Sequence, residues 1–135
     1  MTEEPEGGVV SSFDPDAAVD AAADVAGEDL LLAVAYDDER FEVLRVADVV
    51  RSFYENDAAM REHFADVHSY VHLDFTERNL FEDLFVGAGE VRAFATHMDH
   101  LVAVRVVAET EGLFLSLAPG GPTREVVAAV GDRIR

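Results

Sequence analysis

The chain contains no cysteine and no lysine. Without cysteine, disulfides, iron–sulfur clusters, Cys-ligated zinc sites and thiol nucleophiles are excluded. Without lysine there is no phosphate-binding P-loop of the Walker type. No apolar run approaches the ~20 residues of a membrane-spanning helix, and the acidic N-terminus lacks the basic and apolar regions of a signal peptide. These absences predict a soluble, cytoplasmic protein with no membrane-inserted segment.

Negative charge dominates the composition, with 28 acidic residues against 10 basic ones and a formal net charge of -18. Such a chain lacks the basic stripe that nucleic acids require, and it is repelled by anionic membranes. An acidic surface that uses only arginine is typical of a high-salt cytoplasm, where the Debye length falls to ~3 Å and self-repulsion is screened. We therefore expect a halophilic archaeal source, although a GC-rich genome would also favour arginine.

The length of 135 residues fits one domain. Residues 1–12 are interpreted as a flexible acidic tail, and residues 13–135 as a single α+β domain. Asp14 and Pro15 are typical of a helix start, and Gly27 of a helix end. The continuous apolar run 30–36 predicts a strand buried on both faces, whereas the alternation in 41–46 predicts a half-exposed partner strand.

The middle of the chain is predicted to be helical, in three segments. Asp48, Asp57, and either Asp74 or Thr76 are the expected N-caps. The last segment is expected to end at Gly87 or Gly89. The second segment, which extends to His72, repeats apolar residues at helical spacing: Met60, Phe64, Val67 and Val71.

The rest of the chain predicts three more strands and a helix. Residues 90–98 and 101–108 form a hairpin, residues 113–118 a further strand, and the helix begins at Thr123 with Val126, Val127, Val130 and Ile134 facing inward. The fold class is therefore α+β, with a five-stranded, mostly antiparallel sheet covered by helices in the order α-ββ-helical insert-βββ-α.

This order resembles roadblock (dynein light chain) domains and the wider profilin-like group. The segments FEVLRVADVVRSFY, LFEDLFVGAGEVRAFATHMDHLVAVRVV and EGLFLSLAP also resemble small, acidic, uncharacterised haloarchaeal proteins. The roadblock resemblance implies a non-enzymatic platform that dimerises and binds small GTPases or other cytoplasmic proteins. The longer helical middle departs from roadblock proportions.

Histidines are the first candidates for chemistry. His68 and His72 are four residues apart in a predicted helix, which places both rings on one face. However, Ser69 occupies the place of the glutamate in an HExxH zinc motif. A metal site could also include His97 and His100 if the fold brought all four together. The favoured interpretation has no metal and no cofactor, with His97 and His100 near a turn at the surface.

Other motifs predict no catalysis. No serine lies in a G-x-S-x-G elbow, and Ser116, within a strand, is expected to face solvent or pair across the sheet. Gly87-Ala88-Gly89 follows a helix and precedes a strand, which is the reverse of a dinucleotide-binding turn. We therefore expect no catalytic residues.

Aromatic residues concentrate in the helical middle, and most are interpreted as core: Phe53, Tyr54, Phe64, Tyr70, Phe75, Phe81 and Phe85. An apolar remainder left exposed would mark a partner site, and apolar contact is strengthened by high salt. The predicted interaction residues lie on the last helical segment and the following strand: Phe81, Leu84, Phe85, Val91, Ala93 and Ala95. The preferred function is thus a non-enzymatic, dimerising interaction module. The alternatives are a small-ligand sensor with an apolar pocket between sheet and helical insert, and a histidine-based metal enzyme.

Overall fold

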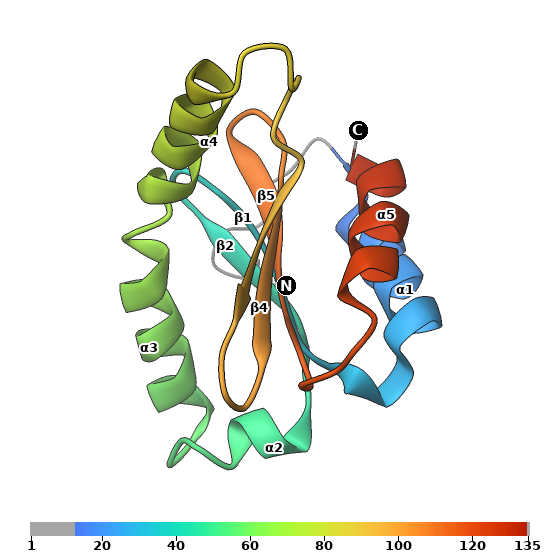
Figure 1. Cartoon of the computed structure of the whole chain (residues 1–135). Helices are drawn as coiled ribbons and strands as arrows, with labels where there is room; N and C mark the ends of the chain where they lie inside the picture. The colour runs from blue at the N-terminus through green and yellow to red at the C-terminus, as the bar shows by residue number, and fades with distance from the viewer. Residues whose placement is uncertain (1–12, 135) are drawn as a thin grey trace.

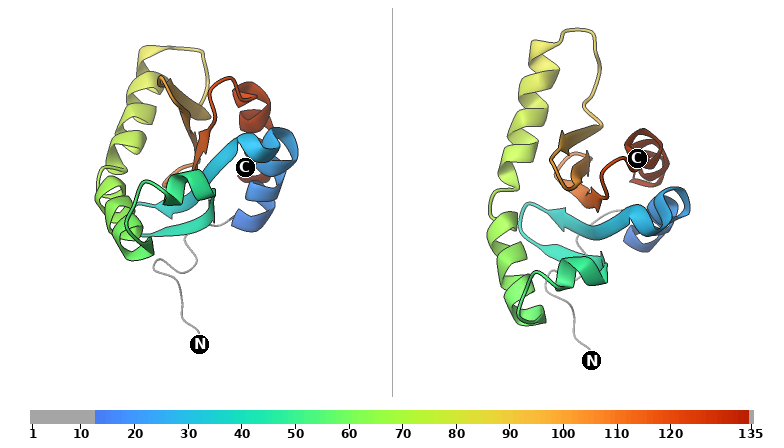
Figure 2. Two further views of the ribbon diagram at one scale, coloured as in Figure 1. Left: turned by 90° about the horizontal axis from the view of Figure 1, so that it is seen from below. Right: turned by 60° about the horizontal axis from the view of Figure 1, so that its bottom comes forward.

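The computed structural model describes residues 13–134, which form three layers with the sheet in the middle (Figure 1). One face of the sheet is covered by α1 (Pro15–Ala26) and α5 (Thr123–Ile134). The insert between the second and third strands comprises α2 (Asp48–Arg51), α3 (Asp57–His68) and α4 (His72–Leu84). Helices α3 and α4 lie along the opposite face, as the views in Figure 2 also show. The predicted tail, residues 1–12, lies outside the described residues.

The sheet has five strands in the order β2-β1-β5-β4-β3. Each neighbouring pair is antiparallel, so β2 and β3 are the edge strands. The strands are β1 (Leu30–Asp37), β2 (Phe41–Val46), β3 (Ala93–His97), β4 (Val102–Val107) and β5 (Glu111–Leu117). The short 3-10 helix η1 (Gly27–Asp29) joins α1 to β1. The predicted α+β class with a five-stranded antiparallel sheet is confirmed.

The ends of α1 are formed as predicted. The Asp14 side chain accepts hydrogen bonds from the backbone N–H groups of Asp16 and Ala17, at 3.0 and 3.3 Å. Pro15 is the first helical residue, where its missing N–H costs nothing. Gly27 ends the helix at a φ of 58°, in the region that favours glycine.

The main core lies between the sheet and the helices α1 and α5. Alternate residues of β4 and β5 point into it, and Val126, Val130 and Ile134 cover them from α5, as predicted. Val127 packs at its margin. The strand β1 contributes to this core and to the opposite face, which confirms that it is buried on both sides.

The opposite face has a smaller core of four buried residues, and the aromatic prediction is wrong there. Leu32, Val34, Tyr36 and Phe41 are buried, all from β1 and β2. None of the seven aromatic residues expected in the core is buried; Phe53 and Tyr70 are 77% and 64% exposed. Phe64 and Phe75 pack only at the margin. The helical insert therefore covers this face incompletely.

The helix boundaries in the insert also differ from prediction. Helix α2 ends at Arg51, and its N-cap is Ala47 rather than Asp48. Asn56, not Asp57, caps α3, and its side chain accepts from the N–H of Ala59. Neither Asp74 nor Thr76 caps α4, which begins at His72. An acidic residue near a helix start is suited either to the N-cap or to the first turn, where its charge interacts favourably with the helix dipole. The presence of Asp48, Asp57 and Asp74 therefore did not identify the N-cap residues.

The last two helices of the insert end earlier than predicted. Helix α3 ends at His68, so His68 and His72 lie on different helices. Helix α4 ends at Leu84, before Gly87 and Gly89, and β3 begins only at Ala93. Within residues 13–134, no helix combines the length and the apolar character needed to cross a bilayer.

Candidate functional site

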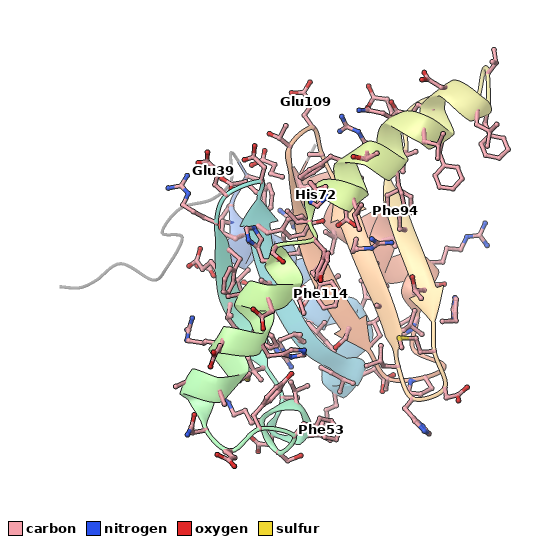
Figure 3. The ribbon with its side chains drawn as sticks, turned by 90° about the vertical axis from the view of Figure 1, so that its left-hand side faces the viewer. Glu39, Phe53, His72, Phe94, Glu109 and Phe114 are labelled. Atoms are coloured by element: carbon pink, nitrogen blue, oxygen red, sulfur yellow. The ribbon has the colours of Figure 1, made fainter. Side chains whose placement is uncertain are left out.

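A cavity of about 560 Å³, partly open to solvent, lies between the sheet and the helical insert. Figure 3 looks onto this face of the molecule, with Phe114 on the sheet beside α3 and Phe53 just after α2, at the beginning of the insert. The walls of the cavity are mainly apolar, and the residues that line it come from all five strands and from the insert.

Small side chains on the sheet account for the cavity. Ala103 on β4 lies directly opposite Ser116 on β5 and Thr96 on β3. All three line the cavity. Residues opposite one another share a sheet face, so the three side chains form a row on the face that the insert covers. Because all three are small, they leave space between the sheet and the insert, and we call this row the cavity floor.

The rim of the cavity is exposed and apolar. Phe53, Val67 and Tyr70 line it, and each is more than half exposed. Within α2, α3 and α4 only Met60 and Asp74 are buried. The expected inward positions Phe64 and Val71 are partly buried, whereas Val67 is exposed. The insert thus stands away from the sheet instead of packing closely against it.

A buried ionic cluster forms one wall. Asp74, in the first turn of α4, is 5% exposed. Its Oδ2 accepts a hydrogen bond of 2.9 Å from the Tyr36 hydroxyl, and its Oδ1 pairs with Arg105 Nη1. The Arg105 guanidinium also lies 4.9 Å from the centroid of the Phe94 ring. The cluster joins β1, β4, β3 and the insert.

Tyr36 acts as a permanent donor in this cluster. Burial raises the pKa of its phenol well above the usual value of 10.0, and the Asp74 charge and hydrogen bond raise it further against the opposing effect of Arg105. The phenol therefore stays protonated at neutral pH and donates to Asp74. The charges of Asp74 and Arg105 compensate each other, so the cluster as a whole is neutral.

Glycine at position 112 makes room for the Tyr36 ring. Gly112 lies directly opposite Tyr36 in the β1–β5 pair. A Cβ atom at this position would lie 2.7 Å from the Tyr36 hydroxyl oxygen and 2.9 Å from the Val106 carbonyl oxygen. Any side chain at position 112 would consequently displace the phenol from Asp74.

Ser116 is a polar residue on the cavity floor whose hydroxyl has no partner in the described part of the chain. The Ser116 residue as a whole is only 4% exposed, so the expectation that its side chain faces bulk solvent is wrong. Its hydroxyl forms no hydrogen bond within residues 13–134 and lines the cavity. The Ser116 oxygen is not among the buried side-chain atoms that lack a partner, so it is accessible from the cavity. An accessible hydroxyl without a partner can donate a hydrogen bond to a bound molecule.

Two histidines line the cavity, and each already has a polar partner. His63 Nδ1 lies 2.7 Å from the Tyr54 hydroxyl. His68 Nε2 lies 2.8 Å from the Asp37 carbonyl oxygen, and its ring packs beside Phe41 with centroids 5.4 Å apart. Both imidazoles thus help to hold α3 and the loop before it in position at the cavity rim.

The remaining histidines lie elsewhere. His72 begins α4, where Figure 3 shows it at the junction of the two long helices. His97 ends β3, and His100 is in the following turn; both are exposed, as predicted. Across residues 13–134, no group of three or more His, Asp or Glu side chains is arranged to hold a metal ion.

The six predicted interaction residues do not share one surface. Leu84 and Phe85 are exposed at the end of α4. Phe81 is partly buried, with its ring centroid 6.0 Å from those of Phe85 and Phe94. Val91 is partly buried before β3 begins, and its N–H donates to Glu82. Ala93 and Ala95 project from the other face of β3, where Ala93 packs against the main core and Ala95 is exposed.

The ionic cluster and the cavity floor were missed by sequence reasoning. One signal was present: Arg105 interrupts the apolar run 101–107, where a charge on a strand needs a partner. The partner, Asp74, lies 31 residues away on another element, and nothing local distinguishes it from the other acidic residues.

Comparison of the chain with protein-family models, with curated proteins and with solved structures finds no match.

Proposed function

We propose that this domain is a non-catalytic small-ligand sensor whose binding site is the cavity between the sheet and the helical insert. One observation carries the proposal: an apolar cavity of about 560 Å³ contains an unpartnered hydroxyl and lies beside a buried ionic cluster. Small-molecule sites usually have volumes of ~300–1,000 Å³, mainly apolar walls and few polar groups. The acidic, lysine-free composition is consistent with a sensor working in the cytoplasm of a halophilic archaeon.

The insert is the element that would respond to a ligand. It makes few buried contacts with the sheet, since only Met60 and Asp74 are buried within its helices. Weakly packed elements are drawn from the least stable part of a fold and are the ones that move in signalling. A ligand that filled the cavity would add contacts between insert and sheet and so order the insert.

Filling the cavity floor is expected to abolish binding of an apolar probe. Replacement of Ala103 by tryptophan would place an indole over the row formed with Thr96 and Ser116. We expect N-phenyl-1-naphthylamine to bind the unmodified protein with enhanced fluorescence, and Ala103→Trp to weaken binding about tenfold or more, a loss of ~1.4 kcal/mol. Fluorescence titration with excitation outside tryptophan absorption measures both affinities.

The matched control is Ala128→Trp, because Ala128 is exposed on α5 in the opposite layer. It adds the same indole without entering the cavity and should leave probe affinity unchanged. Equal affinity in the Ala103 variant and the control, or no saturable binding to the unmodified protein, would refute the ligand-sensor proposal.

A second candidate function is self-association, which rests on a different observation. Four apolar residues at the C-terminal end of α4 are more than half exposed, with Val86 at 92%; we call Leu80, Leu84, Phe85 and Val86 the α4 apolar end. The nearby strand β3 is an open sheet edge, and such edges can pair with another chain. The resemblance to roadblock domains, which dimerise and bind small GTPases, is consistent with this candidate.

Polar substitution in the α4 apolar end is expected to convert a dimer to a monomer. The double variant Leu80→Gln, Leu84→Gln removes apolar surface while retaining good helix-forming residues. Light scattering in molar salt, where apolar contact is strengthened, should show about half the mass of the unmodified protein. Val25→Gln, on α1, replaces another exposed apolar residue and should leave the mass unchanged. A monomeric unmodified protein would exclude this candidate.

A further inference from the structure

The charge of the cavity wall is internally balanced. Of the residues that line it, Asp74 and Arg105 are the only acidic residue and the only arginine, and they pair with each other. An anionic ligand would have to displace Asp74 from Arg105 or be buried without a counter-charge, and both are costly. The formal charge of -18 on the whole chain also repels anions. The cavity therefore favours a molecule without negative charge.

Two residues of the cavity, Arg105 and Ser116, have hydrogen-bond donors that are not used within the described chain. Arg105 carries five N–H donors and no acceptor, and its only polar partner in the described chain is Asp74. Ser116 provides a second free O–H group. The two residues are diagonal neighbours, because Arg105 faces Phe114 and Ser116 faces Ala103. A ligand that presents an acceptor oxygen can use these donors, whereas a cation without an acceptor would leave them without a partner.

The other lining residues favour a ligand that contains aromatic rings. Nine of the 21 lining residues carry aromatic or imidazole rings: Tyr36, Phe41, Phe53, Tyr54, His63, Phe64, His68, Tyr70 and Phe114. Aromatic pairs are favourable in offset and edge-to-face arrangements, which planar ligands can extend. A dry cavity of about 150 Å³ holds one benzene, so a cavity of about 560 Å³ has room for fused or linked rings.

We infer that the ligand is an uncharged, mainly aromatic molecule bearing a carbonyl-type acceptor oxygen, which accepts a hydrogen bond from Ser116 at the cavity floor. Arg105, held by Asp74, offers further N–H groups to a second acceptor. This inference rests on the proposed ligand-sensor function and adds to it the chemical class of the ligand.

Displacement of N-phenyl-1-naphthylamine by four naphthalenes of similar size tests this class. The competitors are 2-acetylnaphthalene, 2-ethylnaphthalene, 2-naphthoate and 2-naphthyltrimethylammonium. We expect the ketone to bind about fivefold more tightly than the ethyl compound, the factor that a net hydrogen bond of ~1 kcal/mol provides. Both ions should bind at least ~10-fold more weakly than the ketone. Molar salt screens long-range repulsion, so the penalty for naphthoate then reports the cavity itself.

Ser116→Ala provides the residue-level test. It should lower the affinity for the ketone to that for the ethyl compound and leave the ethyl compound unaffected. Ser52→Ala is the matched control, because Ser52 is exposed and its hydroxyl donates to the Val49 carbonyl oxygen outside the cavity. Circular dichroism and thermal unfolding confirm that both variants fold.

The outcomes separate the two proposals. If the fluorescent probe does not bind, the ligand-sensor function fails and the ligand class fails with it. If the probe binds but either ion competes as well as the ketone, the cavity is a ligand site and the uncharged class is wrong. If the ketone and the ethyl compound compete equally, or if Ser116→Ala affects both alike, the acceptor contact with Ser116 is wrong.

Discussion

Replacement of Asp74 by alanine is expected to lower the free energy of unfolding by about 3 kcal/mol. Removing one partner of a buried ion pair typically costs ~3–5 kcal/mol, because it leaves the other charge uncompensated. Here Arg105 would lose its partner while its side chain is 24% exposed, and the Tyr36 hydroxyl would lose its acceptor. Partial access of Arg105 to water places the expected loss at the lower end of that range. Urea unfolding followed by circular dichroism in molar salt measures it.

Asp57→Ala is the matched control for this prediction. Asp57 also lies in the first turn of a helix and also pairs with an arginine, Arg51, but their side chains are 67% and 45% exposed. Both substitutions lose the same favourable interaction with a helix N-terminus, and an exposed pair contributes little. The control should therefore cost about 1 kcal/mol or less. Equal losses in the two variants would show that the Asp74 cluster is no stronger than a surface pair.

Replacement of Gly112 by alanine is expected to cost about 2–3 kcal/mol. The added methyl group would lie within 3 Å of the Tyr36 hydroxyl oxygen and of the Val106 carbonyl oxygen. Overpacking of a core typically costs ~1–3 kcal/mol, and displacement of Tyr36 from Asp74 adds the loss of a buried hydrogen bond, about 1 kcal/mol. Thermal or urea unfolding of the variant gives the value.

Gly131→Ala is the opposite case, because Gly131 lies within α5 and an added Cβ would meet nothing within 4 Å. Alanine is a better helix former than glycine by ~0.8–1.0 kcal/mol, so this variant should be more stable than the unmodified protein. If Gly112→Ala were neutral, the Tyr36 ring would be free to move aside, and the cluster would be looser than its geometry indicates. Combining Gly112→Ala with Tyr36→Phe identifies the clash, since removal of the hydroxyl should recover part of the loss.

The ligand-binding and self-association proposals involve different parts of the insert. Ligand binding uses the side of α3 and α4 that faces the sheet, whereas the α4 apolar end lies beyond the cavity lining. The Ala103→Trp and Leu80→Gln, Leu84→Gln variants should therefore act independently. A shared effect, such as probe binding that changes the molecular mass, would link cavity occupancy to the exposed end of α4.

Local patterns were sufficient for much of the fold. Asp14, Pro15 and Gly27 marked the ends of α1 because capping depends on residues within one helical turn. The alternation of Phe41 and Val43 with Glu42 and Leu44 assigned the two faces of β2, because side chains along a strand alternate. The inward residues of α5 followed from helical periodicity in the same way.

The insert was predicted least well, because its helices are not enclosed by the rest of the fold. Its aromatic content indicated a core, but Phe53 and Tyr70 are exposed. Burial depends on how closely a helix approaches the sheet, and α3 and α4 stand away from it. The single helix expected through His72 ends at His68, and the next begins at His72. His68 and His72 therefore belong to two different helices, and their rings do not share one helix face as expected.

The sequence by itself determined the class of the domain, the strands and terminal helices, and the absence of cysteine and lysine chemistry, because each depends on composition or on neighbours within a few residues. Only the tertiary structure decided the candidate site. The floor residues Thr96, Ala103 and Ser116 become adjacent through strand pairing, and Asp74 meets Tyr36 and Arg105 across 38 and 31 residues of chain. Strand register and helix packing bring these residues together, and no local sequence pattern predicts the cavity that remains between the sheet and the insert.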